Sequence, residues 1–249
     1  MNVSFFVACL TETLYPRAGI AAVKVLEHLG CKVDFPPDQT CCGQPMWNAG
    51  FRDQTKKVAK RMIRVFESSE CVVTPSGSCC AMVREYYPEM FNGDPDWEAS
   101  AQGLVDKTYE FVEFLIEVLK VDLKALGVKW SSKATYHYSC HLRGIGMRDD
   151  VVPAMLQQID GLDYVPLEKM DQCCGFGGVF ALKYPQVSGS LVRDKVACIA
   201  ATGAPVVVVN DAGCTMNIEG ACQRGNVDVK FMSLAEVIAE GLGLMDEDA

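Results

Sequence analysis

An internal duplication constrains the fold of this 249-residue chain more than any other feature. Three short segments occur twice in the same order: FFVAC is matched by YHYSC, CCG by a second CCG, and VVTPSGSC by VVVNDAGC. Equivalent cysteines of the two copies lie 131, 132 and 135 positions apart, so the frame drifts by only four residues. Three ordered matches at nearly one spacing predict two related halves.

Each half alternates short apolar strands with amphipathic helices. The first half predicts strands over Val3–Ala8, Lys32–Phe35 and Val72–Thr74 and helices over Ile20–Leu29, Arg52–Ser68 and Ala81–Phe91. The second predicts strands near Ala134–Tyr138, Asp163–Pro166, Val206–Asn210 and Val229–Met232, with helices near Asp150–Ile159, Pro185–Ala201, Met216–Arg224 and Ser233–Glu240. This alternation is typical of βαβ units. We expect an α/β fold of two repeated βα halves with parallel, Rossmann-like sheets.

The segment between the halves has its own pattern. An apolar stripe at helical spacing runs through Val105, Tyr109, Val112, Ile116 and Leu119. It predicts a helical extension at about 96–126, strongly helical from residue 105. We therefore expect the first repeat to span 1–128, including this extension, and the second to span 129–249.

Charge and cysteine content exclude several classes of protein. With 23 Lys and Arg against 32 Asp and Glu, the net charge of −9 argues against nucleic-acid binding. The sequence holds no apolar run long enough to span a membrane and no export signal at its start, so we expect a cytoplasmic protein. In that reducing compartment the 13 cysteines should be thiols or metal ligands.

The repeated cysteines follow strands at equivalent places. The first of each half closes the first strand, the pair lies in the loop after the second strand, and the last stands just beyond the third or its equivalent. Carboxyl ends of parallel strands meet at one edge of a sheet. We therefore expect two sets of four to converge at the carboxyl ends of the strands: Cys9, Cys41, Cys42 and Cys79, and Cys140, Cys173, Cys174 and Cys214.

Four soft thiolates in one place suit an iron–sulfur cluster or zinc. The sequence contains no C-x-x-C, the usual spacing of structural zinc knuckles. Adjacent cysteines are awkward for one tetrahedral zinc, whereas a multi-iron cluster accepts neighbouring thiolates on different irons. The pattern favours iron–sulfur clusters, with zinc and a thiol-only site as alternatives.

The other cysteines have weaker signals. Four lack a counterpart in the other half and are expected to be small buried apolar residues: Cys31, Cys71, Cys198 and Cys222. Cys80 adjoins Cys79, but its equivalent in the second half is Thr215. A core or spare thiol is the preferred interpretation of Cys80, and an extra ligand is the alternative.

Histidine and arginine near Cys140 offer further candidates. His137 lies three residues earlier, so strand alternation predicts that it packs on the opposite face of the sheet. His141 could ligate or shuttle protons, but a surface position beside the site is the preferred interpretation. Arg143 and Arg148 could balance cluster charge or bind an anionic substrate, and solvated loop positions are the simpler expectation.

Several long motifs carry a family resemblance. NVSFFVACL, LGCKVDFPPDQTCCGQPMWNAG, TPSGSCCAM, CCGFGG, GCTMNI and FMSLAEVI resemble the cysteine-rich (CCG) domain that occurs twice in one of the polypeptides of heterodisulfide reductase and in its relatives. Among these, the chain is most similar to the lactate utilization protein A family. The resemblance spans nearly the whole sequence.

The resemblance implies an iron–sulfur subunit of a multi-protein oxidoreductase system that oxidises L-lactate to pyruvate, with no activity expected of the subunit alone. It implies a ferredoxin-like iron–sulfur subunit and a third small subunit as partners, and the eight repeated cysteines as cluster ligands. Alternatives are a zinc- or thiol-bearing assembly subunit, or a CCG-type redox subunit acting on glycolate or a heterodisulfide.

One departure from the wider pattern bears on cluster type. That pattern ends in C-x-x-C, which gives five cysteines per domain, whereas Met82 and Asn217 occupy the final positions here. Four ligands per half favour one [4Fe-4S] cluster in each, unless Cys80 compensates in the first half.

Overall fold

The computed structural model describes residues 1–245 and separates into two compact units, Met1–Leu119 and the residues from Lys120 onward. Each unit holds one four-stranded sheet in which all strands are parallel, which confirms the predicted fold class. Repeat limits at residues 128 and 129 remain predictions about independently folding domains, and the last four residues of the second repeat lie outside the described part. Within residues 1–245, no helix combines the length and apolarity needed to cross a membrane.

The first unit has the sheet order β2-β1-β3-β4. Its elements are β1 (Asn2–Phe5), α1 (Cys9–Leu14), α2 (Pro16–His28), β2 (Lys32–Asp34), α3 (Gln44–Asn48), α4 (Arg52–Val65), β3 (Cys71–Thr74), α5 (Gly77–Ala81), η1 (Met82–Tyr86), α6 (Tyr87–Phe91), α7 (Glu98–Val105), β4 (Thr108–Glu110), α8 (Phe111–Glu113) and η2 (Phe114–Val118), where η marks π-helical turns.

The second unit repeats this order as β6-β5-β7-β8. Its elements are β5 (Lys129–His137), α9 (Cys140–Gly144), α10 (Val151–Leu156), β6 (Asp160–Tyr164), α11 (Val179–Lys183), α12 (Pro185–Thr202), β7 (Val206–Val209), α13 (Ala212–Arg224), β8 (Lys230–Met232) and α14 (Leu234–Gly241). The repeated segments therefore occupy equivalent places in two equivalent sheets.

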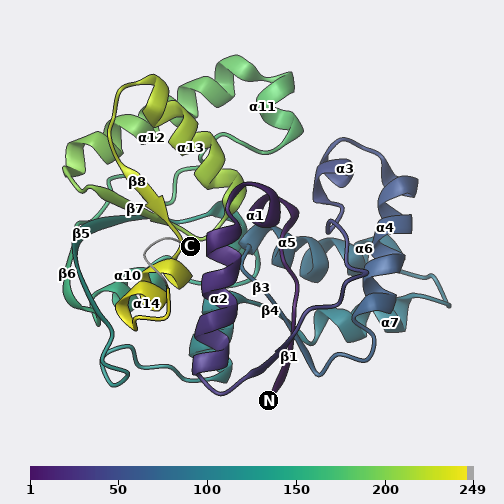
Figure 1. The fold of residues 1–249 in the computed structure, drawn as a ribbon. Coiled ribbons are helices and arrows are strands. Elements are labelled where there is room, and N and C mark those ends of the chain that lie inside the picture. The colour runs from purple at the N-terminus through teal and green to yellow at the C-terminus, as the bar shows by residue number, and fades with distance from the viewer. Residues whose placement is uncertain (246–249) are drawn as a thin grey trace. The chain divides into compact units, whose positions relative to one another are not determined.

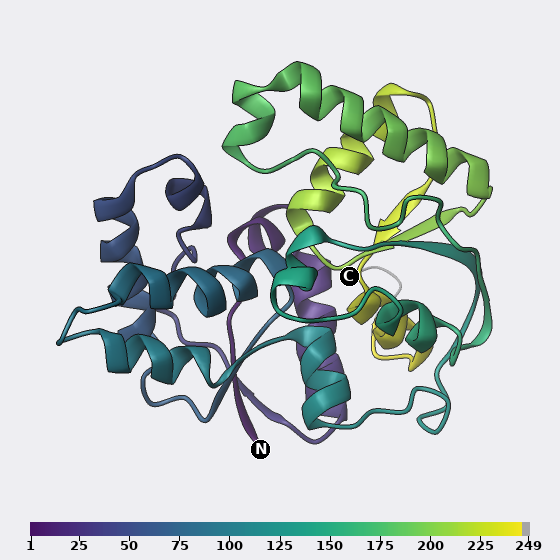
Figure 2. The same ribbon diagram turned by 180° about the vertical axis from the view of Figure 1, so that it is seen from behind.

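Helices cover both faces of each sheet. In the second unit, α12 and α13 lie on one face and α10 and α14 on the other; in the first unit, α2 lies opposite α4 and α7 (Figures 1 and 2). The inner strands β3 and β7 are accordingly buried at all four positions, as expected of a parallel sheet covered on both sides. The run VVVV of β7 fits this place because β-branched side chains pack well on a pleated surface.

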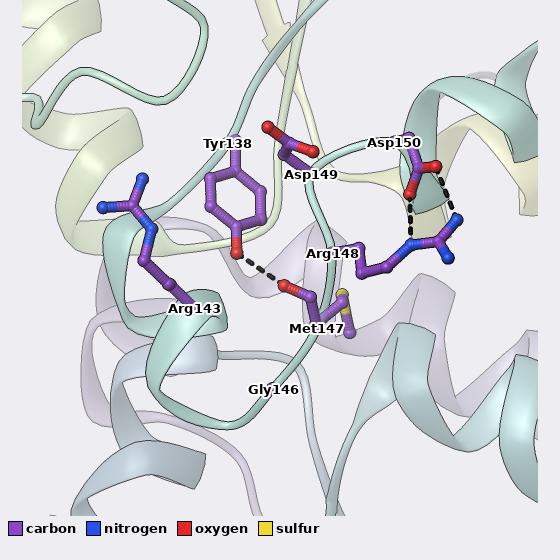
Figure 3. A pocket seen from close by; sticks show the side chains of 7 residues that line it. All are labelled: Tyr138, Arg143, Gly146, Met147, Arg148, Asp149 and Asp150. Atoms are coloured by element: carbon purple, nitrogen blue, oxygen red, sulfur yellow. Dashed lines mark hydrogen bonds and ion pairs between the residues drawn. The ribbon is translucent and has the colours of Figure 1, made fainter.

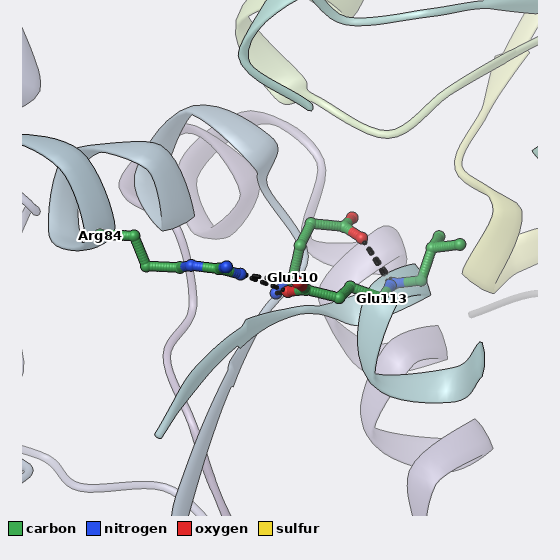
Figure 4. Close-up of polar contacts among 4 residues, drawn as sticks. Arg84, Glu110 and Glu113 are labelled. Carbon is green, nitrogen blue, oxygen red and sulfur yellow. Dashed lines mark hydrogen bonds and ion pairs between the residues drawn. The ribbon is translucent and has the colours of Figure 1, made fainter. Parts of the chain in front are cut away.

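The predicted helix from Val105 is wrong over Thr108–Glu110, where the chain forms the edge strand β4. The segment forms a strand because its backbone pairs with Val72, Val73 and Thr74 of β3. The apolar residues of the predicted stripe therefore lie in β4 and in the helical turns after it. A capping box then starts α8: Glu110 accepts hydrogen bonds from the first-turn N–H groups, and the Glu113 carboxylate accepts from the Glu110 N–H (Figure 4).

The same junction recurs after β8, where Ser233 and Glu236 form the capping box that begins α14. An x-x-x-Glu pattern following a short apolar segment is therefore part of the duplication. It marks a fourth strand and helix in the first half that periodicity alone did not reveal.

Candidate metal centres

The first thiol group comprises the four repeated cysteines of the first unit. Cys9 begins α1, the Cys41–Cys42 pair lies in the loop before α3, and Cys79 lies in α5. The Sγ atoms of Cys9 and Cys41 are 3.7 Å apart. Side-chain hydrogen bonds join Cys42 to both Cys41 and Cys79, so the four thiols form one connected set. Cys42 and Cys79 are buried, whereas Cys9 and Cys41 are partly exposed.

The second thiol group has the same construction. Cys140 begins α9, the Cys173–Cys174 pair lies in the loop before α11, and Cys214 lies in α13. The Sγ atoms of Cys174 and Cys214 are 3.2 Å apart, and Cys173 is hydrogen bonded to Cys140 and Cys174. The inner two thiols are again buried and the outer two partly exposed. The structure thus brings together both predicted sets.

Glycine after each cysteine pair aims a backbone donor at sulfur. Gly43 and Gly175 have φ angles of +93° and +85°, which glycine adopts without strain. In this conformation the Gly43 N–H donates to the Cys41 Sγ at 3.4 Å, and the Gly175 N–H to the Cys173 Sγ at 3.3 Å. An N–H···S bond stabilises a thiolate over a thiol, so both loops are built for sulfur that carries negative charge.

The third strand of each unit leads into a capped helix that carries the last cysteine. The Ser76 side chain accepts a hydrogen bond from the Cys79 N–H at 3.3 Å, and Asp211 accepts from the Gly213 N–H at 3.1 Å. The Cβ atom of any other residue at 213 would meet the Phe176 ring at 2.9 Å. The two caps fix the start of α5 and α13, and in the second unit Phe176 of the cysteine loop lies against that start.

A side-chain donor also satisfies the carbonyl of the second cysteine in each pair. The Tyr87 hydroxyl donates to the Cys42 carbonyl at 2.9 Å, and the Asn217 amide to the Cys174 carbonyl at 2.8 Å. Asn217 stands where the wider CCG pattern has its final cysteine. In this chain that position holds the cysteine loop in place through an amide.

Hydrogen bonds among the thiols set their acidity. The pKa of Cys41 is lowered chiefly by the hydrogen bond with Cys42 and that of Cys173 chiefly by the one with Cys140. The pKa values of Cys42 and Cys140 are raised by those same bonds and by burial. Each group therefore favours one thiolate on its own, and a bound cation would favour deprotonation of the others.

The structure corrects the placement of His137. One of its ring nitrogens and the Sγ atoms of Cys174 and Cys214 lie within 4.8 Å of one another. Strand alternation misled because β5 ends at His137, so the period of two does not extend to Cys140 in α9. Burial, with the charge of Lys195 second, lowers the pKa of His137 to about 3 and keeps the ring neutral.

Lys195 is a second residue that sequence reasoning missed. It is fully buried in α12, and its Nζ donates to the carbonyls of Lys169 and Met170. The signal was available: Lys195 falls on the helical stripe that buries Ser188, Val192 and Ile199. Its pKa is lowered by burial, against the opposing influence of nearby thiols and Asp171.

Cys80 lies in different surroundings from the first thiol group. It is fully buried, and burial followed by Glu113 raises its pKa, while Arg84 lowers it. Arg84 in turn pairs with both oxygens of Glu113, at 2.6 and 2.8 Å (Figure 4). These contacts place the buried Cys80 beside a partly buried ion pair.

His141 lies beside Cys140 of the second thiol group, and the two arginines line a cavity of the same unit. The His141 Nδ1 is 3.8 Å from the Cys140 Sγ. Arg143 and Arg148 line an open cavity of about 370 Å³ with Tyr138, whose hydroxyl donates to the Met147 carbonyl (Figure 3). Both guanidinium groups are exposed and paired, Arg143 with Asp171 and Arg148 with Asp150. Each of the two guanidinium groups at this cavity is thus already engaged by a carboxylate.

Comparison with known proteins gives these sites a family. Residues 3–84 and 134–219 each match the cysteine-rich domain family CCG. The chain is 47% identical to lactate utilization protein A of Macrococcus caseolyticus, with 96% of each chain covered, and 46% identical to that of Exiguobacterium sp., with 97% and 98% covered. This chain belongs to the lactate utilization protein A family. Its two matched domains contain all eight cysteines of the thiol groups.

A further relative, lactate utilization protein A of Bacillus licheniformis, is 45% identical over 96% of this chain and 99% of its own. Among solved structures, an aspartate racemase homologue from Pyrococcus horikoshii OT3 covers 97% of this chain and 96% of its own at 13% identity, with a TM-score of 0.33. A likeness at that level does not establish a shared fold.

The thiol groups of this lactate utilization protein A relative fit a sulfur-ligated metal group. Each offers four soft donors, two of them buried, with a backbone N–H directed at one sulfur. Glycine at positions 43 and 175 lets the backbone approach closely. The chemistry of the donor set fits an iron–sulfur cluster and also zinc.

Proposed function

We propose that this protein is the iron–sulfur subunit of a cytoplasmic multi-protein system that oxidises L-lactate to pyruvate. Each unit holds one cluster, of the [4Fe-4S] type, and electrons from lactate oxidation pass through them. The observation that carries the proposal is the pair of equivalent four-thiol groups in a chain of the lactate utilization protein A family. The partners are a ferredoxin-like iron–sulfur subunit and a third small subunit.

Different residues of the chain would hold the cluster, stabilise its sulfur ligands and shield it from water. A bound iron–sulfur cluster supplies one-electron storage and transfer. The eight cysteines hold it, and the Gly43 and Gly175 N–H groups stabilise sulfur that carries negative charge. Cys42 and Cys174 are buried, so water is excluded from their side of each cluster site. The partly exposed cysteines of each group lie on the side that a redox partner can reach. Burial and N–H···S bonds are the two features by which the chain tunes the reduction potential.

A zinc-bearing assembly subunit is the second candidate, and one geometric observation favours it. Two thiolates on a tetrahedral zinc, at Zn–S distances of about 2.3 Å, lie about 3.8 Å apart. The Cys9 and Cys41 sulfurs are 3.7 Å apart. Such a subunit would organise its partners without carrying electrons.

Anaerobic purification decides between the two. The full-length protein, reconstituted with iron and sulfide, is analysed for iron, acid-labile sulfide and zinc, and by EPR after reduction. We expect iron and sulfide in equal amounts and a reduced-cluster EPR signal. Zinc without iron or sulfide would refute the iron–sulfur assignment and support the assembly subunit.

A deletion strain tests the substrate. Growth on L-lactate should be lost on deletion and restored by the wild-type gene and by Cys198→Ser, but not by Cys42→Ser or Cys174→Ser. Cys198 is a suitable control because it is buried in α12 outside both thiol groups. Unimpaired growth of the deletion strain on L-lactate, with loss of growth on glycolate, would reassign the substrate.

A further inference from the structure

The two thiol groups are equivalent in their cysteines but not in the ring that lies beside them. Cys9 and Cys140 are equivalent, so Phe6 in the first unit corresponds to His137 in the second. Phe6 is 1% exposed and belongs to the same buried cluster as Cys42 and Cys79. His137 is fully buried and lies beside the equivalent pair, Cys174 and Cys214. One scaffold thus presents an apolar ring in one unit and an imidazole in the other.

A buried imidazole at this position destabilises the fold unless its nitrogens have hydrogen-bond partners or bind a metal. Within residues 1–245, neither ring nitrogen of His137 makes a hydrogen bond of normal geometry, although the Met170 backbone lies close enough to interact with the ring. A buried polar group without a partner destabilises the fold, and Phe6 shows that the equivalent place accepts a purely apolar ring. A buried imidazole with one ring nitrogen this close to two thiol sulfurs has a lone pair available to a metal ion.

Resting on the proposed function, we propose that His137 is a fifth ligand, through nitrogen, of the group that the four cysteines of the second thiol group hold, which makes that site a mixed sulfur and nitrogen centre. The first site remains all-sulfur. A neutral imidazole has one lone-pair nitrogen and is a common metal ligand. All three donor atoms, from His137, Cys174 and Cys214, lie within 4.8 Å of one another, so one metal ion can reach them together.

The chain offers a clean spectroscopic test because it contains only three histidines, His28, His137 and His141. His28 is exposed on α2, and His141 is the matched control because its Nδ1 lies 3.8 Å from the Cys140 Sγ. Full-length protein with ¹⁵N-labelled histidine is reconstituted anaerobically with iron and sulfide, reduced, and measured by pulsed EPR for nitrogen coupling.

We expect strong nitrogen coupling in the wild type, loss of this strong coupling in His137→Phe, and its full retention in His141→Asn. Phenylalanine is chosen because the first unit already uses it at this place. The double variant His28→Gln/His141→Asn leaves His137 as the sole histidine and must keep the coupling, so the test stands even if His137→Phe does not fold.

Iron and sulfide analysis of the same samples separates the two levels of the argument. A cluster without ligand-type histidine coupling, or coupling that survives His137→Phe, overturns the assignment of His137 and leaves the proposed function in place. Failure to bind iron and sulfide overturns the proposed function, and the His137 assignment falls with it.

Discussion

Replacement of Gly175 by alanine should destabilise the second unit by more than the cost of a positive φ angle alone. The alanine Cβ would lie 2.7 Å from the Ser188 carbonyl oxygen and 3.2 Å from the Leu191 Cβ. The positive φ of +85° costs an alanine roughly 1–2 kcal/mol. Contact with backbone, which cannot rotate away, adds about 1–3 kcal/mol. Gly175→Ala should therefore lower the free energy of unfolding by about 2–5 kcal/mol.

Gly203→Ala is the matched control in the same unit. Gly203 also has a positive φ, +62°, but a Cβ there meets nothing within 4 Å. It should lose only the backbone contribution, roughly 1–2 kcal/mol. Urea unfolding of the reduced, metal-free protein measures both variants, with Trp130 fluorescence reporting on the second unit and Trp47 and Trp97 on the first. Equal losses in the two variants would refute the reasoning about the Ser188 contact.

Three further predictions follow from the first unit. Tyr87→Phe removes the buried donor to the Cys42 carbonyl and should lower the free energy of unfolding by about 1–3 kcal/mol in the same urea assay. Cys80→Ala should leave the bound iron unchanged, whereas Cys79→Ala should remove the iron of the first site; iron analysis that finds the reverse would make Cys80 a ligand. Burial raises the pKa of Cys71 to about 11 in the folded chain against 9.0 for a free thiol, so the unfolded state loses its proton first. Stability should fall as pH rises from 9 toward 11, and pH-dependent urea unfolding should show a shallower fall in Cys71→Ala.

The spacing of the cysteines was enough to predict most of the fold and the composition of both thiol groups. Three repeated segments required two equivalent sheets, and parallel strands bring their carboxyl ends together at one edge. That argument depends on topology alone, which explains why it placed Cys79 and Cys214 correctly although their helices were assigned too late in the chain.

The wrong predictions were those that relied on local periodicity to assign secondary structure or the direction of a side chain. The apolar stripe from Val105 is compatible with a strand followed by two short helical turns as well as with one helix. Only the pairing of this segment with β3 distinguishes the two structures. His137 was misplaced because alternation was extended beyond the end of β5. Arg84 follows Cys80 by four residues in the same helical run, but its partner Glu113 comes from the separate helix α8, so no pattern around Cys80 could reveal the ion pair.

The measurement that tests the central claim most directly is iron and acid-labile sulfide per chain in four proteins: the wild type, Cys42→Ser, Cys174→Ser and the double variant. Each substitution removes a buried inner thiol from one group only. Two independent clusters predict that each single variant keeps about half of the wild-type iron and sulfide and that the double variant keeps none. A single substitution that empties both sites or neither, or a wild-type protein that carries zinc instead, would contradict the account.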